Sequence, residues 1–169
     1  MRTKELLTAA FAVLVLALAA FLWFSPSGAK VAPPATFTLL DGRTLDLAAL
    51  RGRPVLVTFW ATTCPGCVAE MPHLVELYRD LHGRGLEIVG VAMEYDPPAQ
   101  VREMVARRNV NYPIALDSDG ALARAFGDVR LTPTHFVIDP QGRIVQQKLG
   151  ELDLAALRVR LEPMLKGGA

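Results

Sequence analysis

The two cysteines of this 169-residue chain stand three residues apart, at Cys64 and Cys67. The apolar, β-branched run 54–60 before them predicts a buried strand, and residues 65–82 predict a helix that begins at the first cysteine. Unpaired backbone N–H groups and the helix dipole stabilise negative charge at a helix start, so the thiolate of Cys64 is favoured. Pro65 suits the first helical turn, where its missing N–H costs nothing. Cys67 lies one turn further on, close enough to form a disulfide with Cys64.

Other uses of two cysteines fit this arrangement less well. A purely structural disulfide across so short a loop would stabilise the fold by only about 2 kcal/mol on the chain-entropy model. A structural zinc site needs two more ligands at matching spacing, and the histidines His73, His82 and His135 supply no such pair. Buried inert thiols would not account for the Trp, Pro and Gly residues around the pair. We therefore predict a redox-active pair and no metal.

Thiol–disulfide exchange would give the two cysteines different roles. Cys64 is predicted to be the attacking nucleophile, because it lies at the helix end and is the more exposed of the two. Cys67 is predicted to resolve the mixed disulfide in an intramolecular step with a high effective concentration. The reaction passes between sulfur atoms, so no cofactor is predicted.

Three segments around the cysteines resemble a known family. They are 59–67 (Phe-Trp-Ala-Thr-Thr-Cys-Pro-Gly-Cys), 70–72 (Glu-Met-Pro) and 132–139 (Thr-Pro-Thr-His-Phe-Val-Ile-Asp). Together they resemble the membrane-anchored TlpA/ResA-like thiol:disulfide oxidoreductases of the thioredoxin-fold superfamily, and the resemblance covers about residues 35–165. It implies a thioredoxin-like fold and an enzyme that exchanges disulfides with other proteins.

The resemblance also implies roles for residues around the pair. Pro133 is implied as the cis-proline that faces the cysteines, and the backbone of Thr132 is implied to offer hydrogen bonds to an extended peptide substrate. Glu70 is implied as the acidic residue that tunes the active-site thiols. Three residues are predicted to contact the substrate: Thr132, Trp60 and Pro65.

Three of the candidate residues have a second interpretation. Glu70 follows Cys67 at a spacing that places it on the same helix face, where it could take a proton from that thiol or raise the thiol pKa values. The alternative is a surface glutamate. Trp60 either shields the site or is a plain core aromatic. His135 either lines a groove beside Pro133 or is a half-buried polar group satisfied by a neighbour.

The N-terminus is predicted to anchor the chain in a membrane. Arg2 and Lys4 precede an apolar run, 6–24, that as a helix would span about 28 Å and match a bilayer core. Trp23 suits the membrane interface. A cleavable signal peptide ending near residues 17–19 is the alternative. The basic residues would stay in the cytoplasm, which places the rest of the chain on the periplasmic side of the inner membrane.

Length and charge limit the domain organisation and the partners. A chain of 169 residues supports one domain plus a short extra segment, so we predict a signal anchor and the start of a tether over 1–28 and a thioredoxin-like domain over 29–169. The 18 basic and 17 acidic residues leave a net charge of +1, which gives no electrostatic footprint for nucleic acid. No nucleic-acid partner is predicted.

The order of the elements predicts an α/β fold with a mixed central sheet flanked by helices. A small N-terminal hairpin comes first, and a strand and helix over 112–126 match the insertion that TlpA/ResA-like proteins carry. A terminal hairpin and an amphipathic helix close the chain. The predicted strands are 36–40, 43–45, 54–60, 86–93, 112–116, 134–139 and 143–149, and the predicted helices are 65–82, 97–109, 119–126 and 152–165.

The resemblance to TlpA/ResA-like reductases, together with the predicted tether, favours a reductase of disulfides in exported proteins, such as apocytochrome c or a wider set in general thiol homeostasis. Its partners would be those proteins and a membrane-embedded electron donor. A disulfide oxidase of the same fold is one alternative. A membrane-tethered copper-binding chaperone, with Cys64, Cys67 and His135 as ligands, is another. A peroxidase is disfavoured because Ala61 stands where that chemistry has a threonine.

Overall fold

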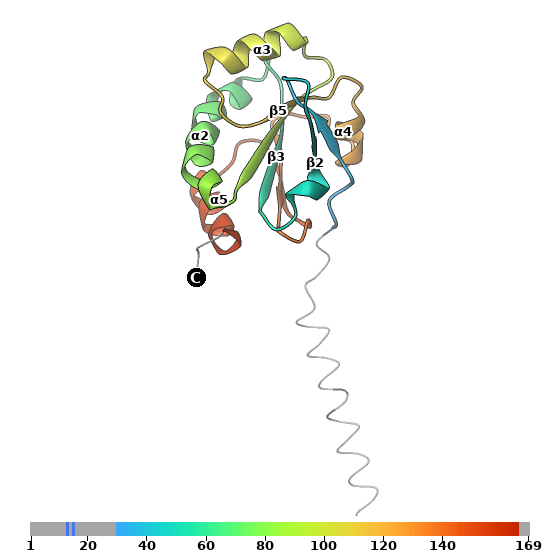
Figure 1. The fold of residues 1–169 in the computed structure, drawn as a ribbon, viewed down its shortest axis with the longest axis vertical. Helices are drawn as coiled ribbons and strands as arrows, with labels where there is room; N and C mark the ends of the chain where they lie inside the picture. The colour runs from blue at the N-terminus through green and yellow to red at the C-terminus, as the bar shows by residue number, and fades with distance from the viewer. Residues whose placement is uncertain (1–12, 14, 16–29, 166–169) are drawn as a thin grey trace, which may run out of the picture.

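A computed structural model describes residues 13, 15 and 30–165 of the chain (Figure 1). The strands are β1 (Thr36–Thr38), β2 (Thr44–Asp46), β3 (Val55–Trp60), β4 (Glu87–Ala92), β5 (Ile114–Leu116), β6 (Thr134–Ile138) and β7 (Ile144–Leu149). The α-helices are α2 (Pro65–Leu81), α3 (Pro98–Arg107), α4 (Ala121–Ala125) and α5 (Leu154–Leu161), with short 3-10 helices at Leu47–Leu50, His82–Arg84 and Glu162–Met164. Every predicted strand and helix is present.

Five strands form one sheet in the order β5-β4-β3-β6-β7. The strands β3, β4 and β5 run parallel to one another, whereas β6 pairs antiparallel with both β3 and β7. The predicted mixed α/β sheet is therefore confirmed. Because β6 runs antiparallel to β3, the first residues of β6 lie at the same end of the sheet as the last residues of β3 and β4.

The central strand β3 divides the interior into two cores, because successive residues of a strand point to opposite faces. Val57 and Phe59 join the core on the side of the hairpin and α4, while Leu56 and Trp60 join the core on the side of α2 and α5. Figure 1 shows α2 and α5 on one side of the sheet and β2 and α4 on the other. Thr58 shares the α2 face with Leu56 and Trp60.

The N-terminal hairpin and the central insertion are both present. Strands β1 and β2 pair antiparallel, and the hairpin reaches the main sheet through a bridge between Leu39 and Ala115. The insertion consists of β5 and α4. The buried carboxylate of Asp117 accepts hydrogen bonds from the backbone N–H groups of Leu122 and Ala123, which satisfies two donors in the first turn of α4.

The first residues of the described domain are bonded to the turn between β6 and β7. The carbonyl of Lys30 accepts a hydrogen bond of 2.8 Å from the Ile144 N–H, and the Ala32 N–H donates one of 2.9 Å to the Gly142 carbonyl. This turn follows the end of β6, so it lies at the edge of the sheet opposite to the end of β3. Residues 30–32 thus enter the domain far from Cys64.

The last helix is shorter than the sequence suggested. We predict one amphipathic helix over 152–165, but α5 ends at Leu161 and a 3-10 turn follows. Pro163 lies in that turn and has no N–H to continue the α-helical ladder, which accounts for the difference. At the other end, the side chain of Asp153 caps α5 by accepting a hydrogen bond of 3.0 Å from the Ala156 N–H.

The predicted membrane anchor lies outside the described residues, apart from Val13 and Val15. The boundary that we predict between residues 28 and 29 also lies outside them. Within the part of the chain that the structure describes, no helix has the length and apolar character needed to cross a bilayer.

Candidate active site

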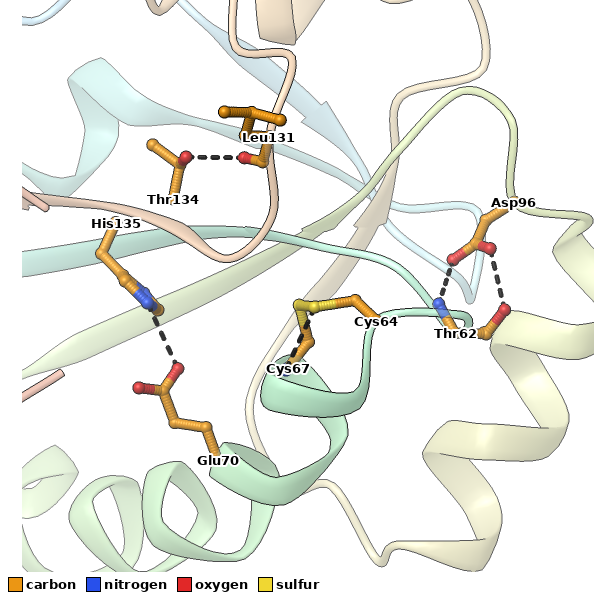
Figure 2. Close-up of a disulfide and its surroundings, with 8 residues drawn as sticks. All are labelled: Thr62, Cys64, Cys67, Glu70, Asp96, Leu131, Thr134 and His135. Carbon is orange, nitrogen blue, oxygen red and sulfur yellow. Dashed lines mark hydrogen bonds and ion pairs between the residues drawn. A yellow bond between two sulfur atoms is a disulfide. The ribbon is translucent and has the colours of Figure 1, made fainter. Parts of the chain in front are cut away.

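The two cysteines lie where the end of β3 meets the start of α2, as predicted. They form a disulfide, and Cys64 is the N-cap of α2, with its sulfur accepting a hydrogen bond of 3.2 Å from the Cys67 N–H (Figure 2). Cys67 is only 3% exposed, whereas Cys64 is half-buried. The prediction that Cys64 is the more exposed of the pair is confirmed.

Pro133 lies against the loop that carries the two cysteines. The peptide bond between Thr132 and Pro133 is cis, as the resemblance implied. A Cβ atom added to Gly66 would lie 3.9 Å from Pro133 Cδ, an ordinary van der Waals distance, so Pro133 packs beside the residue between the two cysteines. Pro133 is buried, and its carbonyl accepts a hydrogen bond from the Gly150 N–H.

The segment before Pro133 forms the more accessible side of the site. Leu131 is 62% exposed and Thr132 is half-buried, while the Leu131 carbonyl accepts a hydrogen bond of 2.7 Å from Thr134 Oγ1. Pro65, on the cysteine loop, is also exposed. Exposed apolar side chains therefore stand both directly after Cys64, at Pro65, and in the segment before Pro133, at Leu131.

Glu70 lies in the interior, on the inner face of α2. It is 6% exposed, and its Oε1 accepts a hydrogen bond of 2.7 Å from the Leu152 N–H. Burial raises the pKa of Glu70, and the Leu152 hydrogen bond opposes that rise. The alternative of a surface glutamate is therefore wrong, since α5 and the segment before it cover this part of the helix.

His135 is more deeply buried than a half-buried strand residue. It is 1% exposed, and its Nε2 lies 3.3 Å from Glu70 Oε2 (Figure 2). Neither ring nitrogen has a hydrogen bond of good geometry to the described residues. Burial lowers the pKa of His135 to about 4, although the backbone of Gly150 opposes this shift. His73 and His82, by contrast, are exposed on helix surfaces.

Cys67 and Glu70 both line a small cavity of about 10 Å³. Its lining residues are Thr58, Trp60, Cys67, Glu70, Met71, Leu74, Tyr112 and Pro133. Trp60 is 3% exposed and its indole N–H has no hydrogen-bond partner among the described residues. This position agrees with shielding of the site, while contact between Trp60 and a substrate stays a prediction. Burial raises the pKa of Tyr112, and the charge of Glu70 adds to the rise.

Asp96 holds the loop that delivers Cys64, and the sequence did not reveal it. Its carboxylate accepts a hydrogen bond of 2.6 Å from the Thr62 N–H and one of 2.8 Å from Thr62 Oγ1 (Figure 2). Asp96 is 5% exposed and follows the end of β4. Its place after a predicted strand next to the central one was the available signal, because parallel strands end at the same edge of a sheet.

The geometry supports a two-electron exchange at sulfur. One cysteine is accessible at a helix N-terminus, the second is enclosed beside a buried carboxyl group, and a cis-proline lies across the loop. No group of three or more His, Cys, Asp or Glu side chains is arranged to hold a metal ion within residues 30–165.

Comparison with known proteins agrees with this geometry. The model of the family described as Redoxin matches residues 26–157. The chain belongs to the Redoxin family. A thiol-disulfide oxidoreductase ResA of Bacillus thuringiensis is 33% identical over 122 residues, which are 72% of this chain and 69% of that protein. The ResA of Geobacillus thermodenitrificans is 32% identical over 133 residues, which are 79% of this chain and 75% of that protein.

Solved structures of this Redoxin-family fold extend the comparison. A thiol:disulfide interchange protein of the thioredoxin family from Chlorobium tepidum has a TM-score of 0.75 at 27% identity, covering 83% of this chain and 99% of its own. A thioredoxin described as putative, from Neisseria meningitidis, has a TM-score of 0.74 at 31% identity, covering 81% of this chain and 91% of its own. The protein is a TlpA/ResA-like oxidoreductase of thiols and disulfides, with a thioredoxin-like fold.

The Asp96–Thr62 contact predicts a loss of stability in an Asp96→Ala variant. Removing the carboxylate leaves the Thr62 N–H without its acceptor, which should lower the free energy of unfolding by about 1–3 kcal/mol. Urea unfolding measures the change. Glu103→Ala is a matched control, because Glu103 forms an exposed ion pair with Arg107 on α3, and its removal should cost under about 0.5 kcal/mol. Equal losses in the two variants would show that Asp96 does not hold this loop.

Proposed function

We propose that the protein reduces disulfide bonds of exported proteins while anchored in the cytoplasmic membrane, with its catalytic domain on the extracytoplasmic side. The observation that carries the proposal is the half-buried Cys64 at the start of α2, with Cys67 enclosed behind it and Glu70 one turn further along. This arrangement separates the attacking sulfur from the resolving sulfur, which is what a dithiol reductant needs.

The proposed reaction transfers two electrons in two exchanges. In the reduced protein, the Cys64 thiolate attacks one sulfur of a substrate disulfide, a mixed disulfide forms, and the other substrate sulfur leaves as a thiolate that takes up a proton. Cys67 then loses its proton and attacks the Cys64 sulfur, which releases the second substrate thiol and leaves the Cys64–Cys67 disulfide. A dithiol electron donor restores the reduced pair by the reverse exchanges.

The residues around the pair would bind the substrate polypeptide. The backbone of Thr132, beside the cis peptide bond, is available to pair with an extended segment that crosses Cys64. Leu131 and Pro65 offer exposed apolar surface on either side of that segment. Trp60 supports the loop from within. Exported proteins with disulfides, including apocytochrome c, are the proposed substrates.

The location and the direction of the reaction are proposed from the sequence together with the family. The apolar run 6–24 has the length of a membrane span, and the basic residues before it favour retention of that end in the cytoplasm. An oxidising compartment lies outside the membrane, where a reductant is useful only if its electrons are renewed. A membrane-embedded electron donor would renew them.

The exchange order predicts different behaviour of two cysteine variants. Cys67→Ser should accumulate mixed disulfides with partner proteins, because the resolving thiol is missing, whereas Cys64→Ser should accumulate none. Non-reducing electrophoresis of alkylated cell extracts, followed by identification of the trapped partners, measures this difference. Equal trapping by the two variants would show that Cys64 is not the attacking sulfur.

The proposed direction predicts a reducing potential. Equilibration of the purified protein with glutathione buffers should give a value nearer to ~−200 mV or below than to the ~−120 mV of strong oxidants of this fold, and about 30 mV corresponds to about 1.4 kcal/mol for this two-electron couple. Thiol alkylation in cells should find Cys64 and Cys67 at least partly reduced. A potential near the oxidant value with a fully oxidised pair in cells would indicate a disulfide oxidase.

The proposed topology predicts that the full-length protein stays with the membrane after alkaline washing. Protease should reach the catalytic domain only from the extracytoplasmic side, because the basic N-terminal end remains in the cytoplasm. Immunoblotting of washed membranes and of protease-treated spheroplasts measures both properties. Recovery of a shortened soluble form would indicate a cleaved signal peptide.

A further inference from the structure

We propose that His135 is a positioning residue of the disulfide exchange, whose Nε2 accepts a hydrogen bond from the protonated carboxyl group of Glu70 and so enables Glu70 to take up the proton of Cys67. This inference rests on the proposed exchange reaction and adds a residue to it. His135 touches neither cysteine in this account and acts only through Glu70.

The contact between the two side chains requires a proton. His135 Nε2 and Glu70 Oε2 lie 3.3 Å apart, and the residues are 1% and 6% exposed. The other carboxyl oxygen, Oε1, is already bonded to the Leu152 N–H. Buried polar atoms in folded proteins are nearly always hydrogen-bonded, and two bare acceptors cannot bond each other. A proton between Nε2 and Oε2 satisfies both atoms.

The surrounding groups place that proton on the carboxyl group. Burial raises the pKa of Glu70 and the charge of Glu151 adds to the rise, while the Leu152 hydrogen bond and His73 oppose it. Burial, with a smaller contribution from Lys148, its partner across the β6–β7 register, lowers the pKa of His135 to about 4, while the backbone of Gly150 opposes the shift. The imidazole is therefore neutral at neutral pH, and its Nε2 lies 3.3 Å from Glu70 Oε2.

Tyr112 is the remaining ionisable group near this pair. Its pKa is raised, so its hydroxyl stays neutral and adds no charge to the cavity. Glu70 and Cys67 line that same cavity, which gives the carboxyl group access to the resolving thiol. The buried pair can thus hold, in the disulfide form, the proton that Cys67 holds in the reduced form.

The proton transfer completes the second exchange. The structure shows the disulfide form, in which the proton lies on Glu70. In the reduced protein Cys67 holds this proton and Glu70 is ionised. In the second exchange the S–H bond of Cys67 breaks, its proton passes to the ionised Glu70 Oε2, and the thiolate attacks the Cys64 sulfur. The Cys64–Cys67 bond forms with the electron pair of that thiolate, while the bond between Cys64 and the bound sulfur breaks and its electron pair leaves with the departing thiolate. His135 stabilises the newly protonated carboxyl group, which raises the fraction of Cys67 present as thiolate.

Two releases of a coloured thiol test this role in the reduced full-length protein. With 5,5′-dithiobis(2-nitrobenzoate), attack by Cys64 releases the first thionitrobenzoate and attack by Cys67 on the mixed disulfide releases the second. In His135→Phe, the second release at pH 7 should slow by about fivefold or more, the effect expected from losing one hydrogen bond. Above about pH 9.5 the rates should converge with those of the wild type, because the thiol then ionises without help.

Matched variants separate positioning from packing. In His135→Gln, the side-chain carbonyl can accept the same hydrogen bond, so this variant should recover most of the rate. His82 is exposed in the 3-10 turn after α2, so His82→Phe should change neither release. The double variant Glu70→Gln/His135→Phe should be no slower than Glu70→Gln alone, because His135 acts through Glu70. Where His135→Phe does not fold, His135→Leu takes its place.

Three outcomes would overturn the inference, and they differ from failure of the proposed function. Slowing of the second release by the same factor at every pH would indicate loss of packing. If the second release were unchanged in His135→Phe but slow in Glu70→Gln, Glu70 would keep its role in the proton transfer and His135 would have none. Equal slowing in His135→Gln and His135→Phe would exclude the hydrogen bond. If the wild type gave no second release, the dithiol exchange itself would be wrong.

Discussion

The antiparallel pairing of β6 with the central strand is the constraint on which the site depends. It brings the start of β6, and with it Pro133, to the edge where β3 and β4 end. Cys64 follows β3 and Asp96 follows β4 at this edge, so three segments distant in the chain meet within one loop cluster. With all strands parallel, Pro133 would lie at the opposite edge, and the cysteine pair would lack the segment that covers it.

The two faces of the sheet differ in the residues that they bury: one face is apolar, and the other also contains the polar groups of the site. The face toward the hairpin and α4 is apolar, with Phe59, Phe126 and Phe136 in edge-to-face or tilted contact. The face toward α2 contains Thr58, Glu70 and His135 among its apolar residues. Burial of a lone ionised group costs several kcal/mol, so these polar groups are tolerated only because they are neutral or bonded to one another and to the backbone.

The sequence was sufficient for the elements and for the local parts of the site. The spacing of Cys64 and Cys67 after an apolar run predicted the strand, the helix start and the more exposed sulfur, and the resemblance supplied the cis bond before Pro133. The contacts of Glu70 with His135 and of Asp96 with Thr62 were not predicted. Each joins residues 34 or more positions apart, and depends on how a helix or loop is seated on the sheet, which no local pattern records.

The hydrogen bonds between residues 30–32 and the β6–β7 turn determine at which end of the sheet the N-terminal segment is attached. These residues join the sheet at the edge opposite to Cys64, so any force or tether acting through the N-terminus reaches the molecule at its base. The reactive sulfur then points outward, away from the point of attachment, with the length of β3 between them. The length of the sheet therefore separates the segment through which the domain is attached from the cysteine pair that exchanges electrons with a partner.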